Sequence, residues 1–361
     1  MGTRKRVLVA MSGGVDSSVA AVLLKKEGYE VIGVTMRLYD LPLDVVVGSC
    51  CAPRDIDDAK AVAHKLEIPH YVFDFREEFM KRVIKPFANE YVVGRTPNPC
   101  ILCNEKIKFG ILLKKALELD AVAVATGHHA RIKIHNGKRM VRRGKDEKKD
   151  QSYFLYFLTH QTLENVLFPV GDITKNKARS IAKELGLKTA EKAESQEICF
   201  VVDGGYGKIV EAYADRVPSY GDIVYKDGSI LGKHRGIHHY TVGQRRGLGI
   251  GRGKPLYVIE LNPTTNEVKV GFREESLSMG LIAEDVVWNA PLPPIQGRAI
   301  SVKIRHQGNF LTAFIFPNSK KEFKVVFDSP HPAVTPGQAA VFYDGELVLG
   351  GGWIKSRIEP N

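Results

Sequence analysis

The chain has 361 residues, of which 44% are hydrophobic, and this length predicts a globular protein of about two or three domains. No stretch reaches the roughly 18 consecutive apolar residues of a membrane span, and no apolar signal region precedes the first predicted strand. We therefore expect a cytoplasmic protein with no membrane partner. The net charge of +11 and pI near 9.3 favour a nucleic-acid partner.

The first half of the chain alternates predicted strands and helices. We expect strands at 7–11, 31–36, 71–75 and 121–126, and helices at 16–26, 56–66 and about 104–117. This βαβ order predicts a parallel α/β sheet covered on both faces. Ligands of such sheets bind beyond the carboxyl ends of the strands.

The segment from Ser12 to Ser17 lies between the first predicted strand and the first predicted helix. Gly13 and Gly14 allow a phosphate to approach the backbone, the serine hydroxyls donate hydrogen bonds, and the helix N-terminus favours an anion. Asp16 is a candidate ligand of Mg²⁺. The segment lacks the Gly-Lys-Ser/Thr ending of the mononucleotide loop and the G-x-G-x-x-G of dinucleotide folds. We therefore interpret it as a nucleotide pyrophosphate site.

An adenylate bound at this loop is expected to reach the ends of the neighbouring strands as well. The candidate nucleotide-binding residues are Ala10, Met11, Ser12, Gly13, Gly14, Val15, Asp16, Ser17, Met36 and Gly127.

Asn136-Gly137 predicts a tight hairpin, and basic residues cluster on and after it between Lys138 and Lys149. The cluster is either a phosphate-backbone contact or a solvated loop. Helical patterns follow at 153–158 and from Thr174, a predicted N-cap, to Leu185. After about residue 203 the pattern changes to short alternating strands, which predicts compact barrels.

Five cysteines, an odd number, argue against a structural disulfide framework. Cys100 and Cys103 form a C-x-x-C just before a predicted helix, where the helix N-terminus and the nearby Lys106 and Lys108 favour a thiolate. Spacing alone leaves redox chemistry, an iron–sulfur cluster, zinc and chance open, although zinc lacks a second close pair of ligands. Cys199 on its own resembles a small core residue, and Cys50 and Cys51 are expected to be structural.

Six motifs in chain order resemble the successive signatures of the tRNA-specific 2-thiouridylases, which belong to the PP-loop ATP pyrophosphatases. They are Ala-Met-Ser-Gly-Gly-Val-Asp-Ser (10–17), Thr-Pro-Asn-Pro (96–99) with Cys103-Asn104, Ala-Thr-Gly-His (125–128), Lys-Asp-Gln-Ser-Tyr (149–153), Ser-Gln-Glu-Ile-Cys-Phe (195–200) and Gly-Gln-Arg-Arg-Gly-Leu (243–248). The resemblance spans nearly the whole chain.

The resemblance implies a PP-loop (adenine nucleotide alpha hydrolase-like) domain at 1–203, a small, mostly β central domain at 204–277 and a C-terminal β-barrel at 278–361. It implies adenylation of the C2 oxygen of the wobble uridine, followed by sulfur transfer with release of AMP and pyrophosphate. ATP and Mg²⁺ are the implied cofactors. The implied partners are tRNAs for lysine, glutamate and glutamine and a cysteine desulfurase or sulfur-relay protein.

The resemblance also assigns roles to individual residues. The implied catalytic residues are Asp16, Cys199 as the persulfide carrier and Cys103 as its partner. Asn98, Pro99 and Cys100 would flank the target base. The implied tRNA contacts are His128, Lys149, Asp150, Gln151, Arg305, His306 and Gln338.

Cys100 departs from the family pattern, in which many members carry Asp. The additional thiol opens an alternative in which Cys100, Cys103 and Cys199 ligate a [4Fe-4S] cluster and no cysteine is persulfidated. We favour the persulfide route.

Other functions also fit parts of the chain. A PP-loop ligase or amidotransferase acting on a small-molecule carbonyl would need the loop but not the thiols. A non-catalytic RNA-binding protein would not need an intact loop. The glycine-rich segment with Arg245, Arg246 and Arg252 is either a barrel turn or a basic RNA-binding loop.

Overall fold

The computed structural model describes residues 4–40, 53–192, 198–201, 205–251, 253–290 and 297–360. The chain forms two compact units. The first comprises Met1–Val83, Cys100–Val202 and Glu346–Val348, and the second comprises Ile84–Pro99, Asp203–Gly345 and Leu349–Asn361. Cys50, Cys51, Arg252 and residues 195–197 of the cysteine motif lie outside the described residues.

A five-stranded parallel sheet forms the centre of the first unit, as the alternating pattern predicts, in the order β3-β2-β1-β4-β7. Its strands are β1 (Arg6–Ala10), β2 (Glu30–Arg37), β3 (His70–Asp74), β4 (Ala123–Ala125) and β7 (Val166–Leu167). Because β1 lies between β2 and β4, the carboxyl ends of these three strands meet at one edge.

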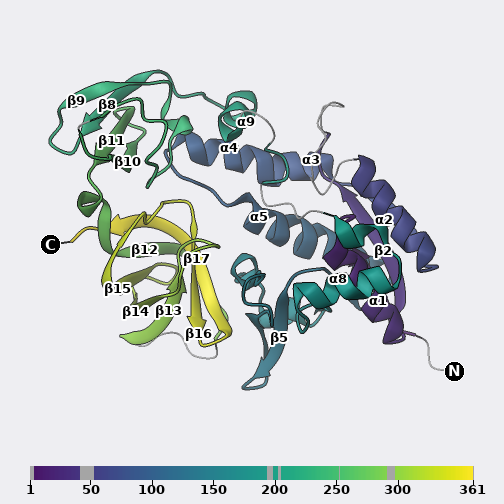
Figure 1. Ribbon diagram of the computed structural model, residues 1–361. Coiled ribbons are helices and arrows are strands. Elements are labelled where there is room, and N and C mark those ends of the chain that lie inside the picture. The colour runs from purple at the N-terminus through teal and green to yellow at the C-terminus, as the bar shows by residue number, and fades with distance from the viewer. Residues whose placement is uncertain are drawn as a thin grey trace. The chain divides into compact units, whose positions relative to one another are not determined.

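Helices α1 (Val15–Lys26), α2 (Pro53–Lys65) and α8 (Lys175–Glu184) cover the sheet of the first unit (Figure 1). Small and β-branched residues of α1, including Val19, Ala20 and Ala21, are fully buried against β1, β2 and α8. Thr174 is the N-cap of α8, as predicted, and its hydroxyl accepts a hydrogen bond from the backbone N–H of Lys177.

Two helical stretches differ from the prediction. The predicted helix at 104–117 begins at Pro99 and runs through α5 (Pro99–Leu102), the π-helix η2 (Cys103–Leu112) and α6 (Leu113–Glu118). Proline suits a first helical turn because it lacks the N–H that would stay unpaired there. A second stretch, α3 (Arg76–Phe79), the π-helix η1 (Met80–Ile84) and α4 (Lys85–Val92), was not predicted.

The predicted hairpin is confirmed. Strands β5 (Ala130–His135) and β6 (Lys138–Arg143) pair in register, and Asn136 and Gly137 turn between them with positive φ angles of 48° and 73°. The helical pattern at 153–158 is only a short 3₁₀ helix, η3 (Ser152–Leu155). Further short elements are α7 (His160–Leu163) and η4 (Lys188–Glu191).

The second unit contains a four-stranded sheet in the order β10-β11-β8-β9. Its strands are β8 (Gly221–Tyr225), β9 (Ile230–His234), β10 (Tyr257–Asn262) and β11 (Glu267–Gly271). Besides the expected strands, this part of the chain contains α9 (Gly205–Tyr213) and the 3₁₀ turn η5 (Ile237–His239), which pack against each other and against α4. Glycines at 204, 205 and 207 weaken the helical signal of α9.

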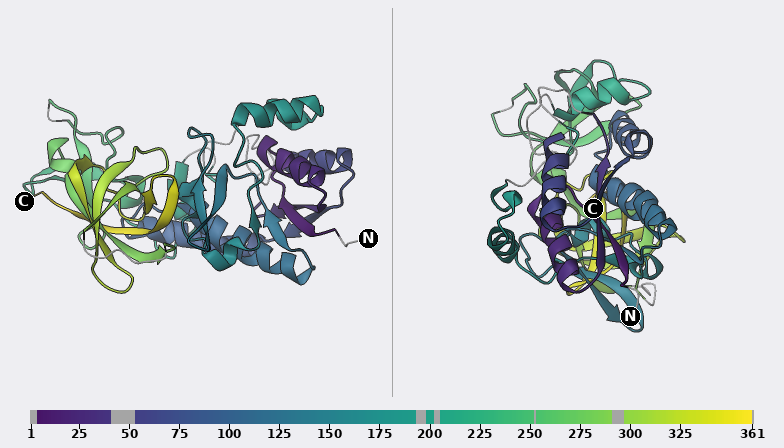
Figure 2. Two further views of the ribbon diagram at one scale, coloured as in Figure 1. Left: turned by 90° about the horizontal axis from the view of Figure 1, so that it is seen from below. Right: turned by 90° about the vertical axis from the view of Figure 1, so that its right-hand side faces the viewer.

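A closed antiparallel barrel follows in the same unit. Its six strands run in the order β12-β15-β14-β13-β16-β17, and pairing of β12 with β17 closes it, as Figures 1 and 2 show in green and yellow. The strands are β12 (Leu277–Trp288), β13 (Arg298–Lys303), β14 (Leu311–Pro317), β15 (Phe323–Pro332), β16 (Ala339–Asp344) and β17 (Leu347–Ile358), preceded by η6 (Glu274–Ser276). None of the described helices combines the length and apolar character needed to cross a membrane.

Candidate functional site

The loop between β1 and α1 exposes the start of a helix at the carboxyl edge of the sheet. Gly13 turns the chain with a φ of +67°, and Gly14 caps α1 in an extended conformation without a side-chain hydrogen bond. Because glycine has no side-chain oxygen, the backbone N–H groups in the first turn of α1 are available to an external acceptor. This is the geometry of an anion site at a helix N-terminus.

The serines of the loop hold its shape from within. Ser17 Oγ accepts a 3.2 Å hydrogen bond from the backbone N–H of Ser12 and donates to the carbonyl of Gly14 at 3.1 Å. Ser18 Oγ donates to the same carbonyl at 2.8 Å. The hydroxyls therefore fix the loop before any ligand binds.

Close backbone packing explains two glycines of the predicted site. A Cβ atom at position 13 would lie 2.3 Å from the carbonyl oxygen of Asp55, and one at position 127 would lie 2.6 Å from the backbone nitrogen of Ser17. Neither distance is sterically tolerable. Gly127 therefore lets the end of β4 lie directly against the first turn of α1.

Asp16 lies in the first turn of α1 between two donors. Its Oδ1 is 3.1 Å from His129 Nε2, and its Oδ2 accepts a 2.6 Å hydrogen bond from Lys175 Nζ. Burial raises the pKa of the Asp16 carboxyl, but the hydrogen bond from His129 and the charge of Lys175 outweigh burial and hold this pKa below its usual range. Asp16 is therefore ionised at neutral pH.

Lys192 supports the loop from the opposite direction. Its Nζ donates to the carbonyl of Gly13 at 3.1 Å, to Asp58 Oδ2 at 2.5 Å and to Asp55. Burial lowers the pKa of Lys192, but its hydrogen bonds to the two carboxylates outweigh burial and raise this pKa. The Gly13 carbonyl is thus held by a charged donor from outside the loop.

The remaining predicted nucleotide contacts lie at the ends of the neighbouring strands. Met11 donates its backbone N–H to the carbonyl of Val34 at 2.8 Å, and the hydroxyl of Thr35 donates to the Met11 carbonyl at 2.9 Å. Met36 follows Thr35 near the carboxyl end of β2 and is half-buried. The structure therefore places Ser12, Met36 and Gly127 at the same edge of the sheet.

Cys100 and Cys103 lie within the first turns of a helix rather than before it, which corrects the predicted position. Residues three apart are neighbours on a helix surface, so the two half-buried cysteines share one side of it. Lys106 Nζ donates a 2.7 Å hydrogen bond to Glu105 Oε1. Its charge is therefore shared with this carboxylate and is not available to a thiolate alone.

Cys199 is held by aromatic packing. The hydroxyl of Tyr39 donates to the Cys199 carbonyl, and Phe200 packs edge-on against Tyr39 and Phe79 with ring centroids 6.5 and 5.8 Å apart. The side chain of Cys199 is half-buried, unlike a core cysteine. Cys199, Cys100 and Cys103 all belong to the first unit.

The three thiols do not form a compact metal group. Among the described residues, only Glu211, His238 and His239 bring three such ligand atoms within 4.8 Å of one another. A single tetrahedral zinc ion requires its thiolate ligands to lie about 4 Å apart.

Three of the residues predicted to contact tRNA make internal contacts in the first unit. His128 is 8% exposed, its Nδ1 lies 2.7 Å from Thr126 Oγ1, and burial lowers its pKa well below the usual value. The buried Asp150 carboxylate accepts hydrogen bonds from the backbone of Gly144 and Ser152. Gln151 Oε1 accepts from the backbone of His129 at 2.9 Å. Lys149 directly precedes Asp150 and is half-buried.

Arginines and lysines of the basic cluster differ in their surroundings. Arg142 pairs with Glu346, and Arg143 lies 3.4 Å from Asp150 Oδ2. Lys138, Lys145 and Lys148 are exposed instead. These three lysines are therefore the part of the cluster that is open to solvent.

Gln338 organises the predicted base-flanking segment within the second unit. Its Nε2 donates to the carbonyl of Thr96 at 2.9 Å and contacts that of Pro97 at 3.4 Å. Asn98 is half-buried, and the buried Pro99 begins α5. In the barrel, Arg305 is exposed and His306 is half-buried in the turn after β13.

The comparisons with known proteins agree along the chain. A family model described as the tRNA methyl transferase HUP domain matches residues 5–203, its PRC-barrel domain matches 210–272, and the aminomethyltransferase beta-barrel domain matches 278–354. The tRNA-specific 2-thiouridylase MnmA of Halothermothrix orenii is 49% identical over 98% of this chain and 99% of its own length. The chain belongs to the tRNA-specific 2-thiouridylase family.

Two further curated proteins and one solved structure are also similar to this chain. The tRNA-specific 2-thiouridylases MnmA of Geotalea uraniireducens and Clostridium perfringens are 49% and 46% identical, over 98% and 99% of this chain and 96% and 100% of their own lengths. A solved 4-thiouridine synthetase–RNA complex with bound ATP is 20% identical, covers 54% of this chain and 45% of its own, and has a TM-score of 0.38.

Sequence reasoning missed three polar residues that this 2-thiouridylase family member places around its loop: His129, Lys175 and Lys192. Lys175 carried a readable signal, because a lysine in the first turn of a predicted helix opposes the helix dipole. No sequence pattern indicated the roles of His129 and Lys192, because their partners are distant in sequence.

Proposed function

We propose that this chain is an ATP-dependent tRNA-uridine 2-sulfurtransferase, which replaces the C2 oxygen of the wobble uridine with sulfur and releases AMP and pyrophosphate. The observation that carries the proposal is the start of α1, which has no side-chain cap and lies beside the hydrogen-bonded pair of Asp16 and Lys175. The family names above supply the tRNA substrate. A methyl transfer from a sulfonium donor would leave this pyrophosphate site without a role.

The loop is proposed to bind ATP, with the loop residues 10–17, Met36 and Gly127 as its contacts. The backbone of Gly13 and Gly14 and the Ser12 hydroxyl would hold pyrophosphate, and Lys175 would lie close to its charge. Asp16 fits a Mg²⁺ contact, because each carboxylate oxygen that accepts one hydrogen bond keeps a second lone pair. Mg²⁺ would neutralise charge on the departing pyrophosphate.

Adenylation is needed because the uridine C2 oxygen is a poor leaving group. Attack of this oxygen on the α-phosphorus of ATP forms the adenylated base and breaks the bond to pyrophosphate. Asn98, Pro99 and Cys100 are proposed to flank the base, which must leave the anticodon stack. Hydrosulfide then adds at C2, and AMP departs with the original oxygen.

Sulfur is proposed to arrive as a persulfide on Cys199, supplied by a cysteine desulfurase or a sulfur-relay protein. The thiolate of Cys103 attacks the Cys199 Sγ, which breaks its bond to the terminal sulfur, releases hydrosulfide and forms a Cys103–Cys199 disulfide. An external thiol reductant returns both cysteines to thiols. In the alternative, Cys100, Cys103 and Cys199 ligate a [4Fe-4S] cluster instead.

The proposed tRNA contacts fall into two groups. Arg305, His306 and Lys149 are proposed as direct contacts, together with the exposed lysines of the hairpin. His128, Asp150, Gln151 and Gln338 are proposed to act by shaping loops, since their polar atoms bond to the chain itself. We also propose domain boundaries at 203/204 and 277/278, which the ranges matched by the family models support. The proposed substrates are the tRNAs for lysine, glutamate and glutamine. The proposed location is the cytoplasm.

The proposal is tested by anaerobic thiolation assays with ATP, tRNA and a persulfide donor, in which mass spectrometry detects 2-thiouridine and AMP is quantified. We expect AMP and 2-thiouridine to form together and only with tRNA. AMP formation stimulated by a small metabolite and not by tRNA would instead support a ligase or amidotransferase.

Two variants separate the sulfur routes. On the persulfide route, Cys199→Ser abolishes thiolation but retains tRNA binding, and Cys100→Asp retains thiolation in iron-free protein. If Cys100→Asp loses both bound iron and activity, the three cysteines are cluster ligands.

A further inference from the structure

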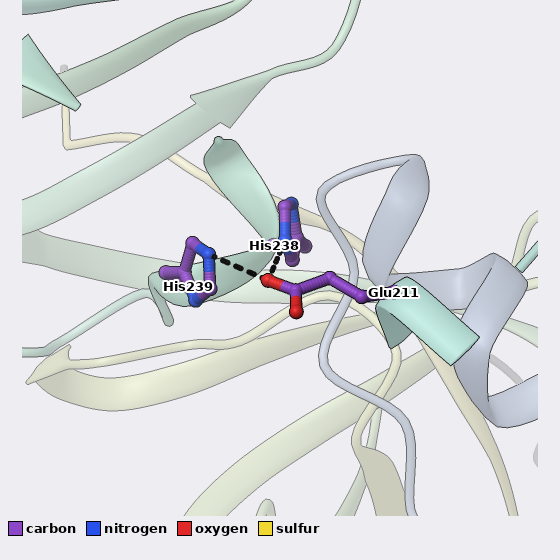
Figure 3. Close-up of side chains that lie close together, drawn as sticks. All are labelled: Glu211, His238 and His239. Atoms are coloured by element: carbon purple, nitrogen blue, oxygen red, sulfur yellow. Dashed lines mark ion pairs between the residues drawn. The ribbon is translucent and has the colours of Figure 1, made fainter. Parts of the chain in front are cut away.

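A cluster of two histidines and a glutamate lies in the second unit, outside the proposed sulfurtransferase machinery. Glu211 comes from α9, and His238 and His239 come from the turn η5. Their side chains converge, with Glu211 Oε1 3.6 Å from His238 Nε2 and 3.4 Å from His239 Nε2 (Figure 3). One ligand atom from each residue lies within 4.8 Å of the other two.

His238 is buried without the hydrogen bonds that a core histidine normally makes. It is 1% exposed, and among the described residues neither of its ring nitrogens has a hydrogen-bond partner. Leaving a buried polar group without a partner destabilises the folded chain. Its Nε2 lies 3.6 Å from the Glu211 carboxylate, beyond the usual hydrogen-bond distance, so both ring nitrogens remain available to a ligand.

The backbone around the rings is built closely enough to hold them in place. A Cβ atom at position 236 would lie 2.4 Å from His238 Cε1, and one at position 207 would lie 2.6 Å from His239 Nδ1. Both positions are glycine. The two rings also pack against each other, with centroids 4.1 Å apart.

The separations agree with ligands of one tetrahedral ion. Ligand atoms at about 2.0–2.1 Å from tetrahedral zinc lie about 3.4 Å apart, whereas adjacent ligands of an octahedral ion at that bond length lie about 3.0 Å apart. The observed distances of 3.4 and 3.6 Å match the tetrahedral value more closely.

We propose that Glu211, His238 and His239 bind one Zn²⁺ ion, with water at the fourth position. Water can reach the site because Glu211 is exposed and His239 is half-buried. The ion would join α9 to η5 beside the four-stranded sheet. It would also fix the start of α9, where Tyr206 stacks on Tyr91 of α4 with ring centroids 4.5 Å apart.

Zinc binding is tested on the full-length protein after treatment with chelator and alkylation of its thiols, because cysteines also bind zinc. We expect calorimetry to show about one bound Zn²⁺ and the melting temperature to rise on its addition. Co²⁺ should give the intense visible bands of a four-coordinate site without a thiolate charge-transfer band.

Single variants identify the ligands. Glu211→Gln and His239→Ala should each weaken zinc binding at least about tenfold. His64→Ala, at an exposed histidine of α2, is the matched control and should bind as the parent does. The proposal is overturned if the alkylated parent binds no stoichiometric zinc, or if both ligand variants retain its affinity. Binding is measured directly, so thiolation activity does not enter the test.

Discussion

Lys175 Nζ donates a 2.6 Å hydrogen bond to Asp16 Oδ2 from the first residue of α8. A positive charge at this end of a helix opposes the helix dipole. The lysine is nevertheless almost fully buried beside Asp16 and the start of α1. The charge of Asp16 accounts for this position, and the proposed pyrophosphate would add to it.

Replacing this lysine should affect both stability and adenylation. In Lys175→Met the half-buried Asp16 loses its charged partner, so we expect the free energy of unfolding to fall by about 2 kcal/mol, less than for a fully buried pair. We also expect tRNA-dependent ATP–pyrophosphate exchange to fall at least about tenfold, because one cation near the phosphates is removed. Lys177→Met changes an exposed lysine of the same helix and should leave exchange unchanged. Equal exchange rates in the two variants would contradict a phosphate-binding role for Lys175.

Gly127 is expected to be essential for nucleotide binding, although it has no side chain to contact the nucleotide. In Gly127→Ala the added Cβ would meet the backbone nitrogen of Ser17, so the first turn of α1 must move. We expect the dissociation constant for ATP, measured by equilibrium dialysis, to rise at least about tenfold. Gly251→Ala places its Cβ in open space and should bind ATP as the parent does. Unchanged ATP affinity in Gly127→Ala would show that this contact does not set the geometry of the loop.

Gln338 is expected to act on tRNA through the chain that it holds. Gln338→Leu removes the hydrogen bonds to the carbonyls of Thr96 and Pro97, which frees the segment before Asn98. We expect the KM for tRNA to rise while the affinity for ATP stays constant. The exposed Gln307 provides the control Gln307→Leu. A fall in kcat at constant KM would contradict a positioning role in tRNA binding.

His128 predicts a pH dependence of stability. Its pKa in the folded protein is lowered by burial and by Lys108 and His129, whereas an unfolded histidine titrates near about 6.5. Below that pH the unfolded chain binds a proton that folded His128 does not. The stabilising contribution is therefore complete above about pH 6.5 and is lost as the pH falls towards the folded pKa, by up to about 1.4 kcal/mol per pH unit.

Urea denaturation between about pH 5 and pH 7.5 measures this slope. His128→Gln should reduce the slope by about one proton, and other buried histidines should retain the remainder. His64→Gln, at an exposed position, should keep the parental slope. A His128→Gln variant with the parental slope would show that His128 takes up a proton in the folded state.

The sequence predicted those elements that depend on residues close together in the chain. Alternating apolar strands and helices indicated the parallel sheet, Asn136-Gly137 indicated the hairpin, and Thr174 indicated the start of α8. The loop at 12–17 also predicted its own position, because a glycine turn between a strand and a helix is a local motif.

Features that depend on distant residues were not predictable in the same way. The bonds of Asp16 to His129 and Lys175 span more than 110 residues of sequence. The start of α5 was placed too late because the prolines at 97 and 99 suggested a loop, whereas Pro99 is itself the first helical residue. The internal roles of Asp150 and Gln151 depend on backbone donors that no side-chain pattern reveals.

The contacts of Gly13 with Asp55 and Lys192 limit how far the loop can be moved to another protein. Asp55 fills the space beside Gly13, and Lys192 binds the Gly13 carbonyl, although both residues lie outside the motif. Grafting residues 12–17 between a strand and a helix of an unrelated scaffold would transfer the sequence of the motif without these two supporting residues. Such a chimera should recover nucleotide affinity only when counterparts of Asp55 and Lys192 are built with the loop.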